Sequence, residues 1–321
     1  MKLILDKIIE SKILDNFVEY QSIFAEFQSQ FLTDLHSRYN GVENGNIILY
    51  YARETHHDIL RQKDYDLNFN ISYEKFWENL SGIIPKQKSI TKIAEDIEVP
   101  KETVRRKVLF LTRQRLLNKI NKNIGWAPSE QYKKDYTVFI NKEIEGISRL
   151  IAFVCKKSDI DISNTLVTKK IKEEFSFYWF HYLNTQLEYL KLCSKQLKDI
   201  DLVLILLQII SLVISKLRTK KISHEKLFKN SELVENFDVT SISSTSIAEI
   251  TSIPRPTCVR KLKHLVKLKL IQQDKISKRY YLLPSSISKN LISKKINEKV
   301  IKIFSNFFLI VVKNLTFKIE S

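Results

Sequence analysis

Two stretches of this sequence repeat each other, and the repeat limits the chain to architectures that hold two copies of one module. Ile93-Ala94-Glu95 matches Ile247-Ala248-Glu249 at an offset of 154 residues, and residues 93–119 contain nine identities in this register. Residues 71–75 match 222–226 upstream, and residues 140–141 match 296–297 downstream, in the same order. The offset drifts only from 151 to 156 residues along the chain, and such collinear self-similarity is typical of duplicated structural units. The sequence therefore predicts two modules, residues 1–160 and 161–321.

The spacing of apolar residues predicts a mainly helical fold. Segments such as 16–38, 141–157, 172–197 and 290–314 carry apolar residues at i, i+3 and i+4 without proline. Strand alternation is confined to short stretches around 116–126 and 270–283. We expect flanking helices around two small β elements, with the two modules related by a pseudo-twofold axis.

The matched core of each copy has the pattern of two short helices followed by a hairpin. Ser89 is a typical N-cap, and Pro100 suits the start of a second helix. The periodicity of that helix predicts an inner and an outer face. The inner faces comprise Val104, Val108, Leu111 and Arg115 in the first copy and Cys258, Leu262 and Leu265 in the second; the outer faces comprise Glu102, Arg106, Leu109 and Arg113, and Pro256, Arg260, Lys263 and Lys267. The pattern is that of a helix-turn-helix at about 89–114 and 243–268, with wing hairpins at about 116–127 and 270–283.

Positive charge is concentrated in these two cores. The chain has a formal net charge of +17, of which residues 89–126 contribute +5 and residues 243–280 contribute +7. A Lys-rich face is often only solvated, but concentration in both cores favours an anionic polymer as the partner. Lysines and arginines of the hairpins, including Lys122, Lys278 and Arg279, are expected to meet phosphates.

The first core, IAEDIEVPKETVRRKVLFLTRQRLL, resembles the winged helix-turn-helix of bacterial transcription regulators of the GntR, MarR and Crp kind, and IAEITSIPRPTCVRKLKHLVKLKLI is a looser match. The usual glycine of the turn is replaced by Glu98 and Ser252. Flanking helices on both sides, twice, are similar to a MarR-type dimer fused into one chain. The resemblance implies contacts to DNA bases from the second helix of each copy. Together with the outer faces and wings, the predicted DNA-binding residues are Lys101, Thr103, Arg106, Arg113, Lys122, Arg255, Thr257, Arg260, Lys263, Lys267, Lys278 and Arg279.

Several other classes of protein are disfavoured. Five scattered glycines leave no phosphate-binding loop, and the sequence has no Ser-His or Cys-His pair at a spacing typical of a catalytic site, so we expect no enzyme and no cofactor. His56 and His57 lack a nearby third ligand, so no metal site is expected. Three distant cysteines, no signal-peptide pattern and apolar runs too short to span a bilayer predict a cytoplasmic protein without membrane segments.

The sequence thus predicts a sequence-specific regulator of transcription that binds double-stranded DNA through two winged helices and is monomeric as a pseudo-dimer. Two alternatives stay open: a replication initiator of the plasmid or phage kind, and a winged-helix scaffold that binds proteins. The sequence does not specify the operator, whether the protein activates or represses transcription, or a small-molecule effector.

Overall fold

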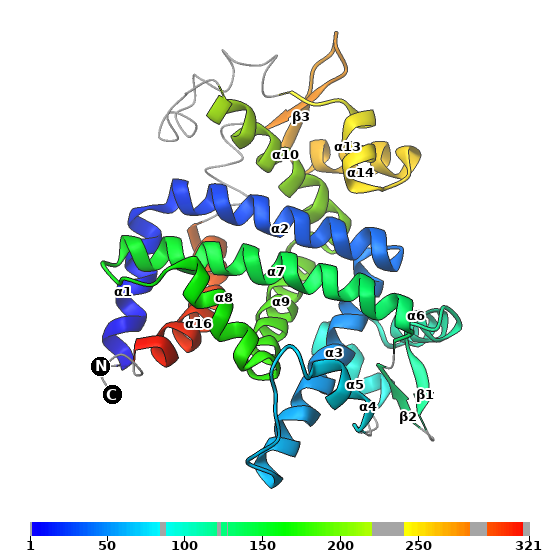
Figure 1. The fold of residues 1–321 in the computed structure, drawn as a ribbon. Helices are drawn as coiled ribbons and strands as arrows, with labels where there is room; N and C mark the ends of the chain where they lie inside the picture. The colour runs from blue at the N-terminus through cyan, green and yellow to red at the C-terminus, as the bar shows by residue number, and fades with distance from the viewer. Residues whose placement is uncertain are drawn as a thin grey trace. The chain divides into compact units, whose positions relative to one another are not determined.

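The computed structural model describes residues 2–83, 88–120, 123–126, 128–219, 241–282 and 294–316. The chain is mainly helical and carries two small antiparallel sheets, as the sequence predicted (Figure 1). The helices are α1 (Lys2–Asp15), α2 (Phe17–Tyr39), α3 (Val42–Tyr65), α4 (Phe76–Ser81), α5 (Ile90–Ile97), α6 (Lys101–Arg113), α7 (Glu130–Lys157), α8 (Asn164–Glu173), α9 (Phe175–Leu197), α10 (Ile200–Thr219), α13 (Ser244–Thr251), α14 (Arg255–Lys267) and α16 (Lys294–Thr316).

Each sheet is a two-stranded hairpin that follows one of the matched helix pairs. Strand β1 (Asn118–Ile120) pairs with β2 (Asn123–Gly125), with Asn118 opposite Gly125. Strand β3 (Ile271–Gln273) pairs with β4 (Tyr280–Leu282), with Ile271 opposite Leu282. Residues 121–122, at the predicted turn of the first hairpin, lie outside the described residues, as do 222–226 of the upstream repeat.

The order of elements repeats along the chain. In the first half, α2 and α3 precede α5, α6 and the hairpin β1–β2, and α7 follows. In the second half, α9 and α10 precede α13, α14 and the hairpin β3–β4, and α16 follows. Helices α2 and α9 each have 23 residues. Long helices therefore precede and follow both matched cores in the same order.

The chain forms two compact units that are discontinuous in sequence. The first contains residues 1–9, 43–196 and 303–321, and the second contains residues 10–42 and 197–302. These units differ from the predicted modules 1–160 and 161–321, because residues 161–196 and 303–321 belong to the first unit and residues 10–42 to the second. Helix α9 belongs to the unit that holds α5 and α6, whereas α2 belongs to the unit that holds α13 and α14.

The first unit is held together by the aromatic side chains of α9. Trp179 is buried and donates a hydrogen bond from Nε1 to the hydroxyl of Tyr136 on α7 over 3.2 Å. The ring of Tyr182 lies 5.8 Å from that of Phe307 on α16. Helix α9 therefore packs through buried aromatic rings against both helices that follow the hairpins, α7 and α16.

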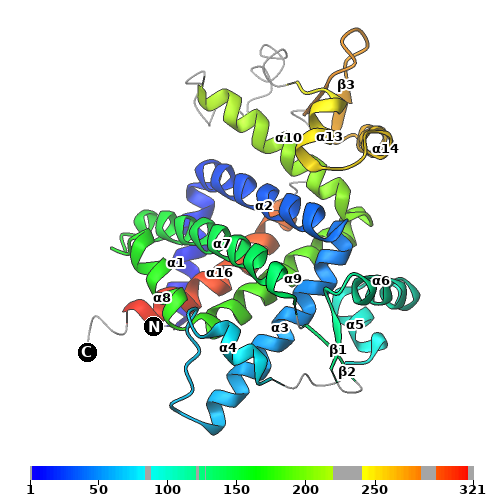
Figure 2. The same cartoon turned by 45° about the vertical axis from the view of Figure 1, so that its right-hand side comes forward.

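The second unit packs α2 along α10, which the views in Figures 1 and 2 both show. Leu204, Ile205 and Ile209 of α10 are fully buried. Gln208 extends this contact with a hydrogen bond of 2.7 Å from Nε2 to Thr33 Oγ1 of α2. Helix α13 also contacts both α2 and α10, so the exchanged helix lies directly behind the second core. None of the helices that the structure describes is long and apolar enough to cross a membrane.

Candidate nucleic-acid interface

The turn between α5 and α6 is fixed by local interactions. Ser89 caps α5, because its hydroxyl accepts a hydrogen bond from the amide of Lys92. Glu98 ends the helix in the left-handed region with φ 54°, and Pro100 is the N-cap of α6. Left-handed backbone normally favours glycine. Glu98 adopts this conformation without being a glycine. Its carboxylate forms ion pairs with Lys191 and Lys195 of α9, at 3.2 and 2.8 Å.

The second core repeats this backbone at the same offset of 154 residues. Ser243 caps α13 through the amide of Ser246, Ser252 has φ 58°, and Pro254 is the N-cap of α14. Left-handed residues also follow both second helices, at Arg115 and Lys269. Five backbone hydrogen bonds recur at matched positions of the two cores. With the residue of the N–H donor before that of the carbonyl acceptor, they are 93→89 and 247→243, 104→100 and 258→254, 114→110 and 268→264, 115→112 and 269→266, and 116→111 and 270→265. The two cores therefore share a local fold as well as a sequence.

Helices α6 and α14 each turn one face inward and one outward, largely as predicted. The buried side chains are Val104, Val108 and Leu111 on α6, and Cys258, Leu262 and Leu265 on α14. The predicted outward residues are exposed, namely Lys101, Glu102, Arg106, Leu109 and Arg113 on α6, and Arg255, Pro256, Arg260, Lys263 and Lys267 on α14; Arg105 and His264 are exposed as well, while Thr103 and Thr257 are half-buried. The outward face of each helix is thus mostly cationic.

Arg115 was predicted to face inward, and this was wrong. Helix α6 ends at Arg113, and Arg115 adopts a left-handed conformation beyond the helix and is exposed. The hairpin residues also differ in availability. Lys278 is exposed, whereas Arg279 is half-buried and donates from Nη2 to the carbonyl of Ser241 over 2.9 Å. Lys122 lies outside the described residues.

Sequence reasoning missed one matched pair of lysines that faces inward. Lys107 on α6 forms an ion pair of 3.0 Å with Glu43 at the start of α3. The matched residue Lys261 on α14 lies 2.6 Å from Asp199 and 3.1 Å from Asp201 at the start of α10. Each lysine is adjacent to an exposed arginine, Arg106 or Arg260. A lysine occurs at this matched position in both copies, and that identity could have predicted the contact. We call these ion pairs, each of which joins an outward helix to the helix behind it, the clamp.

The two outward faces differ in charge. On α6, Arg105 donates three hydrogen bonds from Nε and Nη2 to the carboxylate of Glu102, and these bonds lower the pKa of the glutamate. The matched positions on α14 are Pro256 and Val259, so no such pair neutralises that face. Leu109 is 47% exposed on α6 where α14 presents the exposed Lys263. The second helix therefore presents the more uniformly cationic surface.

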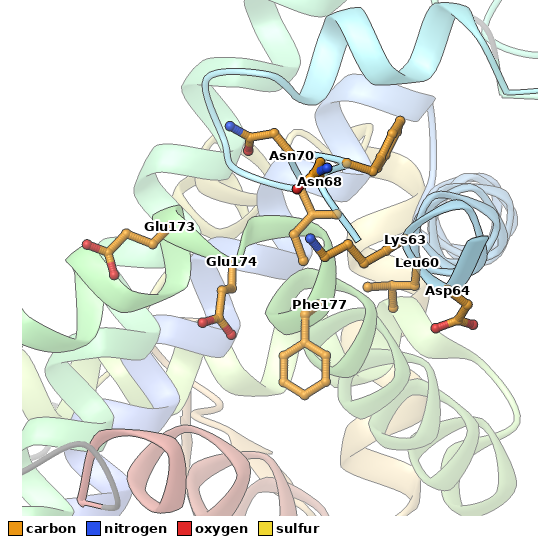
Figure 3. A pocket seen from close by; sticks show the side chains of 10 residues that line it. Leu60, Lys63, Asp64, Asn68, Asn70, Glu173, Glu174 and Phe177 are labelled. Atoms are coloured by element: carbon orange, nitrogen blue, oxygen red, sulfur yellow. The ribbon is translucent and has the colours of Figure 1, made fainter. Parts of the chain in front are cut away.

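A pocket of about 660 Å³ lies elsewhere in the first unit, between the end of α3, the segment 68–71 and the start of α9 (Figure 3). Its lining includes Glu173, Glu174 and Phe177, with Lys63 on the opposite wall. Lys170 pairs with Glu174 at 2.6 Å and Lys169 with Glu173 at 3.8 Å. Because lysines of α8 already compensate both glutamates, this lining does not define a ligand class.

No group of metal-ligating side chains occurs within the described part of the chain. His56 is fully buried, its ring lies 4.8 Å from that of Phe76, and burial lowers its pKa to about 3. His56 is therefore a neutral side chain of the core. Comparison with protein-family models, with curated proteins and with solved structures gives no match.

Proposed function

We propose that this chain is a sequence-specific, double-stranded DNA-binding regulator of transcription that uses two winged helices. The observation that carries the proposal is the duplicated core, in which α6 and α14 bury matched apolar faces and expose matched cationic ones. Two short helices with a tight turn and a following hairpin suit a second helix placed in the major groove. Arg106 and Arg260 are the residues proposed to contact base edges, and the hairpins serve as the first and second wings.

Charge supports duplex DNA as the partner. A protein gains affinity for DNA when its lysines and arginines displace counterions from phosphates, and this gain depends steeply on salt. The exposed cations of both outward helices, together with Lys119 and Lys278 of the hairpins, supply such contacts. Phosphate contacts would fix the register while Arg106, Arg260 and their neighbours read sequence.

The exchange of α2 and α9 supports a monomer as the binding form. Each compact unit contains a long helix from the opposite half of the chain. In a homodimer, a partner subunit would have to supply such a helix, whereas here the same chain supplies it. Because Leu109 and Lys263 differ at matched positions, the two half-sites are proposed to differ in sequence.

Binding titrations against salt and genome-wide footprinting of the intact chain test this function together. We expect duplex affinity that falls steeply with salt and sites at promoters. Protection of repeated sites at a replication origin would instead support the initiator alternative. Salt-insensitive or absent duplex binding would reject DNA recognition and leave the protein-binding scaffold.

A further inference from the structure

The loop between β3 and β4 has a fixed conformation that the Asp274 side chain builds. Asp274 Oδ1 accepts hydrogen bonds from the amide of Ile276 at 3.1 Å, and from the amide and hydroxyl of Ser277 at 2.6 and 2.8 Å. The base of the loop is closed by Lys278 N–H to the Asp274 carbonyl and by Asp274 N–H to the Arg279 carbonyl. The hydrogen bonds that the amide and hydroxyl of Ser277 and the amide of Ile276 donate to the carboxylate lower the pKa of Asp274, so the carboxylate form that holds the loop is present at neutral pH. The tip is therefore ordered before any partner arrives.

The side chain at this tip is apolar. Ile276 is 93% exposed, the highest value among the large hydrophobic residues that the structure describes as exposed. A single exposed isoleucine is ordinary on a protein surface. This one differs because an ordered hairpin presents it between two exposed cations, Lys275 and Lys278. The hairpin has six residues between its strands, whereas the first hairpin has two.

We propose that the second wing enters the minor groove of duplex DNA and inserts Ile276 as an apolar wedge between two base pairs. This inference rests on the proposed function and adds a mode of binding to it. Apolar side chains that enter the minor groove unstack a base step and bend the duplex toward the major groove. Lys275 and Lys278 flank the wedge and are placed to neutralise the phosphates on either side of the groove.

The physical balance favours an ordered tip for this role. Unstacking a base step costs free energy, which burial of the Ile276 side chain and the phosphate contacts offset. A flexible loop would add the cost of its own ordering, and the three hydrogen bonds to Asp274 avoid this cost. Pyrimidine–purine steps are the easiest base steps to bend. The second wing should therefore prefer such a step, although it makes no hydrogen bonds to the bases there.

The experiment uses the full chain and its footprinted duplex, labelled at both ends for energy transfer and with 2-aminopurine scanned through the steps beneath the second wing. The wild type is expected to raise 2-aminopurine fluorescence at one step and to shorten the end-to-end distance. Ile276→Ser should abolish both signals and weaken binding about tenfold, the effect of losing one buried apolar side chain. Ile276→Leu should retain them. Lys275→Gln should lower the salt slope by about one unit and keep the bend.

Ile276→Ser is expected to melt like the wild type, because the side chain makes little contact with the fold. If Ile276→Ser bends DNA as the wild type does, the wedge is rejected while DNA binding stands. If the wild type shows no salt-dependent duplex affinity, the proposed function itself fails. If Ile276→Ser loses binding to anionic phosphatidylglycerol vesicles but keeps duplex bending, the tip belongs to a lipid surface and the proposal is overturned.

Discussion

The ammonium group of Lys261 lies 2.6 Å from the carboxylate of Asp199, and the same group lies 3.1 Å from Asp201. This contact joins the middle of α14 to the start of α10. Burial lowers the pKa of Lys261, but the hydrogen bond that its ammonium donates to Asp199 and the charges of both aspartates raise the pKa more, so the net pKa lies above the ordinary value of 10.5. The lysine is charged at neutral pH and holds the outward helix by its inner face.

Lys261→Met should lower the free energy of unfolding by roughly 1–3 kcal/mol, because it leaves two partly buried carboxylates without their cation. Lys263→Met, two residues further along α14 and exposed, should change stability little. A pKa raised on folding gives stability that is present below pH 10.5 and lost as the pH rises through the folded pKa. Urea titrations at neutral and alkaline pH measure both effects. A Lys261→Met protein as stable as Lys263→Met would contradict the clamp.

The left-handed residues of the two turns provide a matched pair of substitutions. Ser252→Gly should raise the free energy of unfolding by about 0.5–1 kcal/mol, because glycine removes the steric cost of φ 58°. Glu98→Gly removes the same cost but also loses the ion pairs with Lys191 and Lys195. Its gain should therefore be smaller, and Glu98→Gln should lose stability without any gain. Equal stabilisation of both glycine variants in thermal melts would show that the ion pairs of Glu98 contribute nothing.

His56 should make stability depend on acid pH. Its folded pKa is about 3, whereas an exposed histidine protonates near 6.5, so protons favour the unfolded chain between these values. Stability should be lost as the pH falls below 6.5, by up to about 1.4 kcal/mol per pH unit. His56→Leu removes this contribution, so its advantage over the wild type should grow from pH 7 to pH 5. Denaturant titrations at both pH values, with His56→Phe as a second variant, measure the difference. A constant offset would show that His56 titrates in the folded protein as it does in the unfolded chain.

The local parts of the structure were readable from sequence because they rest on local physics. Ser89, Pro100 and the spacing of Val104, Val108 and Leu111 define caps and a buried face within a few turns of helix. Arg115 was wrongly placed on the inner face of α6, since nothing in the composition of 113–116 marks it as left-handed. Periodicity shows which face of α2 or α9 is buried but not which helix covers it. The exchange of these helices, and the pairing of Lys261 with Asp199 across 62 positions, depend on tertiary packing.

Arg106 and Arg260 are expected to carry discrimination between DNA sequences. Each is exposed beside a lysine that anchors its helix, so Arg106→Ala or Arg260→Ala should leave the fold stable and cost roughly 1–3 kcal/mol of preference for the cognate duplex, if the arginine binds a guanine through two hydrogen bonds. Arg105→Ala is a suitable control, because Glu102 already engages Arg105. Titrations with cognate and scrambled duplexes test this prediction. Equal losses of affinity for both duplexes would assign the arginines to phosphate contacts, and unchanged affinity would refute the placement of the helices in the groove.

The final prediction uses the difference between Leu109 and Lys263. Leu109 presents an apolar side chain between Arg106 and Arg113 on the outward face, and the apolar group that the major groove offers is the thymine methyl. Replacing thymine by uracil in the half-site bound by α6 should weaken binding about fourfold, the effect of one buried methyl group. The same replacement in the half-site bound by α14 should have little effect, because Lys263 stands at the matched position.

Charge-removing changes at Lys263 and Lys267 should instead reduce the salt slope of duplex binding by about one unit for each lost phosphate contact. Leu109→Ala should erase the sensitivity of the first half-site to uracil, and Lys263→Leu should create it in the second. If Leu109→Ala remains as sensitive to uracil as the wild type, another residue contacts the methyl group and the outward face of α6 does not lie in the groove as proposed.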